Sequence, residues 1–205
     1  MGMIKNSERY LNGVGDAYYL RRKETLKELK RLWESDPIIV AMQSLGVTKG
    51  SYLEIGCADG WRLDVLRREF GMDCWGIEPS NEAAFGRQNI REGTADDLPF
   101  FEEFDVVSFA YMLYTVDRSD LFKIAFEGDR VLKDGGHMVV YDFYSNVPKL
   151  KENPDCKEIL TCKADYGGMF RWHPCYYEKY EKVQHEPDNP KSHPVIVNVF
   201  QKQLF

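Results

Sequence analysis

Strand-like and helix-like hydrophobic patterns alternate through the middle of the chain. Residues 51–57 form an apolar run typical of a buried strand, and residues 61–70 repeat apolar residues at helical spacing. Further strands are expected over 73–79, 89–94, 104–113 and 137–143, and further helices over 80–88 and 119–132. Ser80 and Ser119 are expected to cap these two helices. The alternation predicts an α/β fold with a Rossmann-like, doubly wound, mostly parallel sheet.

The first part of the chain has helical rather than strand-like patterns. We expect residues 1–15 to form a loop, because two glycines interrupt any regular pattern there. A helix is then expected from Asp16, and a second one over 37–45. Asp36 is suited to cap the second helix, and Pro37 to occupy its first turn. These features predict an N-terminal helical extension.

The regular alternation ends after the strand over 137–143. Residues 144–156 are polar and contain prolines, which predicts an irregular connection. Residues 164–174 are expected to form a short helix or an ordered loop. Strands are expected over 175–187 and 193–204, with a turn over 186–193 between them. Such a pair would lie antiparallel at one edge of the sheet.

Composition narrows the choice of compartment and partner. The net charge of -6 disfavours a nucleic-acid partner. No apolar run approaches the roughly 20 residues of a membrane span, and the first residues lack the apolar core of a secretory signal. The five cysteines include no CxxC pair, which favours a reducing cytoplasm. Cys162, His173 and Cys175 match no common zinc spacing, so no metal is expected.

The sequence LEIGCADG at the end of the first expected strand indicates a ligand site. Gly56 and Gly60 would let a ligand approach the main chain, where parallel strands end. A pyrophosphate site would need the pattern GxGxxG, but Ala58 stands at its middle position. Glu54 and Asp59 would also repel phosphates. The two carboxylates suit a cationic ligand instead, unless they merely cap the next helix.

Two later acidic positions fit the same kind of ligand. Glu78 ends the second strand about 20 residues beyond the loop, where an acid accepts hydrogen bonds from ribose hydroxyls. Asp96 and Asp97 precede a Pro-Phe pair before the fourth strand. Either aspartate could accept a hydrogen bond from the exocyclic amine of a base.

With these motifs in order, the chain resembles class I S-adenosylmethionine-dependent methyltransferases. The resemblance rests on LEIGCADG, GIEPS, GTADDLPF, FDVVSFAYMLYTV and VLKDGGHMVVYDF, and covers roughly residues 50 to 145. It implies S-adenosylmethionine as the cofactor. It also implies one domain over 1–205, divided into a helical extension or lid (1–48), a cofactor-binding core (49–145) and an acceptor-side region with the last two strands (146–205).

The resemblance assigns roles to particular residues of the core. Glu54 would anchor the loop or meet the methionine amino group, and Glu78 with Pro79 would hold the ribose. Either Asp96 or Asp97, beside Ala95, would bind the adenine. The remaining expected cofactor contacts are Gly56, Cys57, Ala58, Asp59, Gly60, Phe109 and Ala110.

A weaker resemblance concerns the sequence GDAYYLRRKE. It is similar to a GDxYxxRNK stretch of small bacterial methylases associated with surface-sugar pathways, including pseudaminic acid clusters, although Arg22 replaces the asparagine. The resemblance implies that Tyr18, Tyr19 and Arg21 form a lid over the methionine end of the cofactor. The alternative is a helix that only packs against the core.

Methyl transfer requires alignment of the acceptor, and a hydroxyl acceptor usually also needs a base. His173 is the first candidate for the base because it titrates nearest neutrality. Asp142 and Tyr114 are further catalytic candidates. Tyr111, Arg171 and Trp172 are candidates for acceptor binding.

We therefore expect a methyltransferase acting on an oxygen or nitrogen of a small polar metabolite, sugar-linked if the weaker resemblance holds. The fourth strand ends in FAYMLY rather than the N/D-P-P-Y/F signature, which disfavours methylation of bases or amides. The expected protein is a cytoplasmic monomer or homodimer without nucleic-acid or membrane partners. The alternatives are an NAD-linked oxidoreductase and a non-catalytic cofactor-binding subunit with a closed acceptor pocket.

Overall fold

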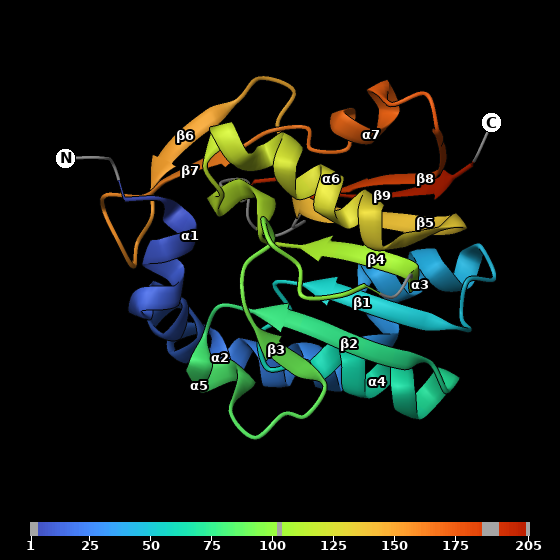
Figure 1. Cartoon of the computed structure of the whole chain (residues 1–205), viewed down its shortest axis with the longest axis horizontal. Coiled ribbons are helices and arrows are strands. Elements are labelled where there is room, and N and C mark those ends of the chain that lie inside the picture. Colours follow the sequence, from blue (N-terminus) through green and yellow to red (C-terminus); the bar gives the residue numbers. More distant parts are fainter. Residues whose placement is uncertain (1–3, 102–103, 186–192, 204–205) are drawn as a thin grey trace.

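The computed structural model describes residues 4–101, 104–185 and 193–203. Its central sheet has seven strands in the order β3-β2-β1-β4-β5-β9-β8 (Figure 1). The strands are β1 (Ser51–Ile55), β2 (Asp73–Glu78), β3 (Ile90–Glu92), β4 (Phe104–Ala110), β5 (Leu132–Phe143), β8 (Tyr176–Gln184) and β9 (Val195–Lys202). The first five are parallel, and β9 lies antiparallel to both β5 and β8. The predicted fold and its antiparallel edge are confirmed.

Helices cover both faces of this sheet because its buried strands carry apolar residues on both sides. Along β1, Tyr52 packs into one core while Leu53 and Ile55 pack into the other. The helices are α2 (Gly15–Arg31), α3 (Pro37–Ser44), α4 (Trp61–Phe70), α5 (Asn81–Ala84), α6 (Leu121–Val131) and α7 (Gly168–Trp172). Buried side chains of α3 and α4 join the Tyr52 core, and those of α6 and α7 join the other.

Helix starts follow the predicted caps in two of three cases. Asp36 accepts a hydrogen bond of 3.1 Å from the backbone N–H of Ile39, and Ser80 caps α5 in the same way. Ser119 does not cap α6. That helix begins at Leu121, after a 3₁₀ turn over Arg118–Asp120, so the prediction for Ser119 was wrong.

The expected loop over residues 1–15 is also wrong for most of its length. Helix α1 spans Asn6–Arg9 and runs through a π-helical turn over Tyr10–Val14 into α2, with a kink at Gly13 (φ +110°). The buried Asn6 side chain donates to the backbone oxygen of Thr115 at 3.0 Å. Contacts with residues far away in the sequence therefore hold a segment whose local pattern predicts no helix.

A second sheet replaces the irregular connection expected over 144–156. Strands β6 (Lys149–Glu152) and β7 (Leu160–Lys163) pair antiparallel as a hairpin. Figure 1 shows this hairpin and α1 on the side toward which the arrows of β2 and β4 point. Both segments thus lie near the carboxyl ends of the parallel strands. The predicted turn over 186–193 falls almost entirely outside the described residues.

Candidate active site

A cavity of about 1130 Å³ lies at the carboxyl ends of the parallel strands. The N-terminal segment (α1, the turn after it, and α2) and the β6–β7 hairpin contribute to its walls. Among the residues predicted from the sequence, the structure brings together Tyr18, Tyr19, Arg21, Glu54, Gly56, Cys57, Ala58, Glu78, Pro79, Ala95, Asp96, Ala110, Tyr111 and Tyr114. The location agrees with the general rule for ligand sites in open α/β sheets.

The loop after β1 turns sharply because three of its residues have positive φ. Gly56 (φ +78°) and Gly60 (φ +69°) are glycines, but Ala58 (φ +49°) carries a Cβ in the same left-handed region. Ala58 occupies the position of the middle glycine in the family pattern, and its conformation gives the physical reason for a glycine there. Its backbone N–H donates to a carboxylate oxygen of Glu78 at 2.8 Å.

Glu78 is fixed at the end of β2. One oxygen accepts from Ala58, and the other accepts from the backbone N–H of Ser80 at 3.0 Å. The side chain is almost entirely buried, and burial raises the pKa of the carboxyl to about 7 although both hydrogen bonds oppose the shift. A buried carboxyl thus faces the cavity from the position predicted for the ribose partner.

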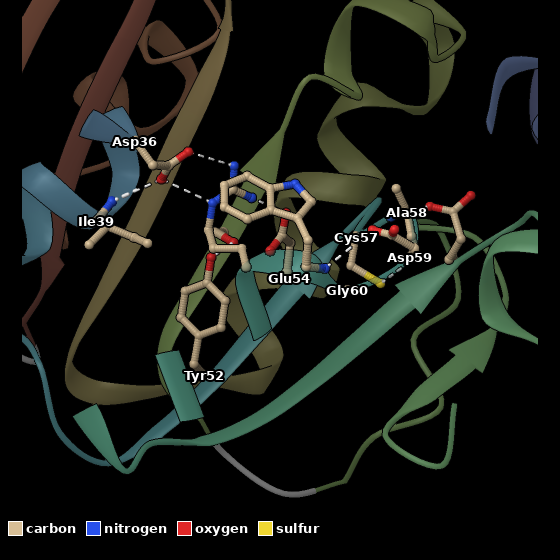
Figure 2. Close-up of polar contacts among 12 residues, drawn as sticks. Asp36, Ile39, Tyr52, Glu54, Cys57, Ala58, Asp59 and Gly60 are labelled. Atoms are coloured by element: carbon tan, nitrogen blue, oxygen red, sulfur yellow. Dashed lines mark hydrogen bonds and ion pairs between the residues drawn. The ribbon is translucent and has the colours of Figure 1, made fainter. Parts of the chain in front are cut away.

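Glu54 belongs to a buried ionic network beneath the loop. The Arg62 guanidinium donates to one oxygen of Glu54 and to both oxygens of Asp36, at 3.1 and 3.0 Å for the Asp36 pair. Figure 2 shows Asp36 and Glu54 on the two sides of this network. Burial raises the pKa of Glu54, and Arg62 opposes the shift. The network ties the start of α3 to α4 and β1.

The second oxygen of Glu54 is buried and has no hydrogen-bond partner within the described residues. Glu54 also lines the cavity. A buried carboxylate oxygen without a donor is unfavourable, so the site suits a ligand that brings one. A cationic amino group is such a donor, and this fits the ligand charge predicted from the loop sequence.

Four residues predicted as cofactor contacts lie outside the cavity lining. Asp59 accepts from the backbone N–H of Trp61 at 3.3 Å, at the start of α4, and Asp97 is exposed. A Cβ on Gly60 would meet Ile90 at 2.8 Å, so this glycine permits packing against β3. Phe109 is fully buried in the core. Asp59, Gly60 and Phe109 thus have structural roles here, and Asp97 lies on the surface.

Asp142 also has a different place from the one predicted. It is fully buried and does not line the cavity. Its carboxylate accepts from the backbone N–H groups of Phe143 at 2.7 Å and Tyr114 at 3.3 Å. Burial raises its pKa to about 7. The carboxyl therefore holds the turn after β4, and through it Tyr114, rather than facing a reactant.

The candidates on and beside α7 are not at the site. His173 accepts from the backbone N–H of Cys175 at 3.2 Å, Arg171 pairs with three acidic side chains near β8, and Trp172 is 81% exposed. None of the three lines the cavity. Phe170, on the same helix, packs on Phe109 in the core. The predictions for His173, Arg171 and Trp172 are corrected accordingly.

The aromatic candidates after β4 do reach the cavity. Tyr111 has a positive φ (+52°), and its hydroxyl donates to the Tyr141 hydroxyl at 2.9 Å. Burial raises the pKa of both Tyr111 and Tyr114. Both phenols therefore stay protonated at neutral pH, and because Tyr111 already donates its proton to Tyr141, it can offer a ligand only the acceptor lone pairs of its oxygen.

Sequence reasoning missed the far end of the cavity. We define the hairpin end of the cavity as the part lined by Tyr141, Phe143, Lys151, Lys157 and Lys163. Three of these residues belong to the hairpin or its connecting loop, for which no strand pattern was recognised. Tyr10, Arg22, His185 and His193 also line the cavity and were not predicted.

The N-terminal segment is held over the cavity at three places. Lys5 pairs with Asp120 at 3.0 Å near its start, and Arg21 pairs with Asp155 in the hairpin loop at 2.7 Å. Between them, Asp16 accepts from the Ser80 hydroxyl at 2.6 Å. The segment thus bridges both sides of the cavity.

Comparisons with known proteins agree with this geometry. A Burkholderia thailandensis 1,6-didemethyltoxoflavin-N1-methyltransferase, solved with 1,6-didemethyltoxoflavin and S-adenosylhomocysteine, has a TM-score of 0.69 at 11% identity, covering 100% of this chain and 93% of that one. An S-adenosylmethionine-dependent methyltransferase from Clostridium acetobutylicum has a TM-score of 0.60 at 13% identity, covering 89% and 99%. A similar enzyme from Methanosarcina mazei gives 0.58 at 18%, covering 76% and 93%.

No curated protein matches the sequence. No helix in the described part of the chain has the length and apolar character needed to span a membrane. Residues 20–180, however, match the methyltransferase domain family. The match covers most of the chain and includes the loop, the Glu78 strand and the turn after β4. The chain therefore belongs to the methyltransferase domain family and, with this fold, to the class I S-adenosylmethionine-dependent methyltransferases.

Proposed function

We propose that the protein transfers the methyl group of S-adenosylmethionine to an oxygen or nitrogen of a small polar metabolite, with sugar-linked metabolites among the candidates. The observation that carries this proposal is the unpartnered oxygen of Glu54 in the same cavity as Glu78 and the tyrosines after β4. Such a cavity has room for a cofactor and a small acceptor together. The Burkholderia neighbour was solved with the small molecule 1,6-didemethyltoxoflavin and S-adenosylhomocysteine, which supports a small-molecule acceptor for this chain as well.

The cofactor-binding roles follow from the chemistry of the lining residues. Glu54 would accept from the amino group of the methionine part, and Glu78 would accept from the ribose hydroxyls. Asp96 is favoured over Asp97 as partner of the adenine amine, because only Asp96 lines the cavity. When bound, the cofactor supplies an electrophilic methyl group on a sulfonium. Residues 1–48 would act as the lid, 49–145 as the cofactor-binding core, and 146–205 as the acceptor side.

Catalysis would rest mainly on alignment of the acceptor. Orientation of two reactants contributes on the order of 7 to 11 kcal/mol. Tyr111, Tyr114 and Tyr141 would hold polar groups of the acceptor by hydrogen bonds. Asp142 would act as a positioning residue, because it fixes the turn that carries Tyr114.

Two alternatives are less well supported. An NAD-linked oxidoreductase would need a pyrophosphate site, but the loop carries Glu54 beneath it and Ala58 at its centre. A non-catalytic subunit would have a closed acceptor pocket, whereas the cavity continues past Tyr111 to the hairpin end. We also propose the cytoplasm as its compartment, because all five cysteines are free thiols, and a monomer or homodimer as its assembly.

Isothermal calorimetry with S-adenosylhomocysteine tests the proposal. We expect binding by the wild type and its loss in Glu78→Ala, while Glu92→Ala, an exposed acid on neighbouring β3, keeps the wild-type affinity. A thermal-shift comparison with NADH should show stabilisation only by S-adenosylhomocysteine. No binding of S-adenosylhomocysteine by a folded wild-type sample would refute the proposal.

A further inference from the structure

Lys163 is a largely buried lysine with no partner in the described part of the chain. It ends β7, lines the cavity and is only 8% exposed. Within the described residues its ammonium makes no hydrogen bond or ion pair, and it lies 4.1 Å from the ring centroid of Phe143. Lysines are almost never buried unless they are paired, and a cation–π contact replaces only part of the lost hydration. The side chain is thus largely buried, while its ammonium opens to the cavity, where an anion would be a suitable partner.

Further lysines add positive charge around it. Lys151 faces the cavity from β6, and Lys157 faces it from the hairpin loop. Burial lowers the pKa of Lys163 to about 8, and Lys151 acts in the same direction. Burial also lowers the pKa of His193 on β9's side of the cavity, and Lys163 contributes to that shift. These directions indicate that like charges lie close together at the hairpin end.

Within the described residues, no acid forms an ion pair with Lys163. The Asp142 carboxylate raises the pKa of Lys163, but its oxygens already accept hydrogen bonds from backbone N–H groups. Asp155 is paired with Arg21. Glu152 lines the cavity and is exposed on β6. The remaining acids of the lining come from the start of α3, the core strands and the loops after those strands: Asp36, Glu54, Glu78, Asp96, Asp117 and Asp120.

We propose that the acceptor carries a carboxylate or phosphate group that binds at the hairpin end of the cavity, with Lys163 as its principal partner and Lys151 as a second. The inference rests on the proposed function, because it assigns the acceptor of the same reaction. The aromatic walls formed by Tyr141 and Phe143 would contact the body of the acceptor. Charge-assisted hydrogen bonds of this kind are the strong ones in proteins.

Binding of three matched probes to the protein loaded with S-adenosylhomocysteine tests this inference. Benzoate and phenyl phosphate carry the two candidate anions on the same ring, and benzamide is the neutral counterpart. Calorimetry should show at least one anion bound about 10-fold or more tightly than benzamide. The tighter of the two anions identifies the group. Equal affinity for all three probes would overturn the inference.

Variants connect the preference to the lysine. Lys163→Met, which keeps most of the apolar stem without the charge, should lower the affinity for the anion to that for benzamide. Lys163→Arg should retain part of the preference, and Lys179→Met, at an exposed lysine of β8, should retain all of it. If Lys163→Met keeps the full preference, the inference is wrong. If Lys163→Met does not fold, Lys151→Met takes its place and should lose part of the preference for the anion. A full preference in Lys151→Met would then count equally against the inference.

The two proposals fail in different ways. A folded wild type that does not bind S-adenosylhomocysteine contradicts the proposed methyltransferase function. Normal binding of S-adenosylhomocysteine without any preference for an anionic probe contradicts only the inference about the acceptor. Both Lys163 variants and Lys179→Met should bind S-adenosylhomocysteine with wild-type affinity. Lys163 belongs to the hairpin and Lys179 to β8, whereas Glu54 and Glu78 belong to β1 and β2.

Discussion

The backbone N–H of Ala58 donates a hydrogen bond of 2.8 Å to the carboxylate of Glu78. This bond joins the loop after β1 to the end of β2, which are the two segments of the predicted cofactor site. Ala58 makes this bond from a positive φ (+49°), which is strained for a residue with a Cβ. The loop therefore combines a strained residue with a buried acid, as strained backbone at functional sites often does.

Replacing Ala58 by glycine should stabilise the protein. The left-handed conformation is unfavourable by roughly 1–2 kcal/mol for a residue with a Cβ, and glycine removes that strain at the expense of some chain entropy. We expect the free energy of unfolding in urea to rise by about 0.5–1 kcal/mol. Ala41→Gly, in the middle of α3, should lower it instead. A loss of stability in Ala58→Gly would contradict this account of the loop.

Glu78 should make stability depend on pH. Its folded pKa of about 7 is above the ordinary value of 4.5, so the folded state binds this proton more tightly than the unfolded state. Its contribution to the free energy of unfolding is therefore lost as pH rises from about 4.5 to about 7. Urea titration measures how far the free energy of unfolding falls across this pH range. In Glu78→Gln, that fall should be smaller than in the wild type by on the order of 1–3 kcal/mol.

Glu54 and Asp142 have raised pKa values for the same reason, so the variant should keep part of the pH dependence. Glu92→Gln, at an exposed position, is the matched control and should follow the wild type at every pH. Equal slopes for Glu78→Gln and the wild type would show that the Glu78 carboxyl is not perturbed.

The parts of the fold that the sequence predicts are those determined by local pattern. The strand over 51–55, the Asp36 cap and the Glu78 position each depend on residues within a few places of one another. The family resemblance adds Ala58 and Asp96 in the same way. Sequence periodicity and short motifs were therefore sufficient for the central sheet, and they placed most of the expected cofactor contacts at one cavity.

Long-range contacts determine the parts that were missed. Asn6 folds into a helix against Thr115, and the hairpin is held to α2 by Arg21 and Asp155, pairs more than 100 residues apart. The imidazole chemistry of His173 makes it a candidate base, but the position of α7 depends on the packing of Phe170 in the core. No local pattern contains this information, so the acceptor side could not be predicted.

Breaking the buried network around Arg62 should be strongly destabilising. Arg62→Met would leave Asp36 and Glu54 as buried acids without their cation, a change that typically lowers the free energy of unfolding by about 3–5 kcal/mol. Urea titration near pH 8 measures the loss. Arg31→Met, which removes an exposed pair with Glu28, should change stability little. Comparable small effects of both variants would refute the importance of the network.

Lys163 should react with acylating reagents at lower pH than other lysines. Its pKa of about 8 means that about half of the side chains are neutral, and therefore nucleophilic, at pH 8, whereas an ordinary lysine is less than about 1% neutral there. Competitive labelling with trace acetic anhydride, followed by peptide mass spectrometry, gives the pH profile of each lysine. Exposed Lys179 serves as the internal standard.

A bound anion should shift this profile. Benzoate or phenyl phosphate at the hairpin end would favour the charged ammonium, so saturating amounts should move the Lys163 midpoint to higher pH without moving that of Lys179. Benzamide should move neither. If Lys163 and Lys179 follow one profile without any probe, Lys163 is not buried among like charges. If the midpoint is low but no anion raises it, the lysine is buried for packing alone, and the anionic acceptor must be given up.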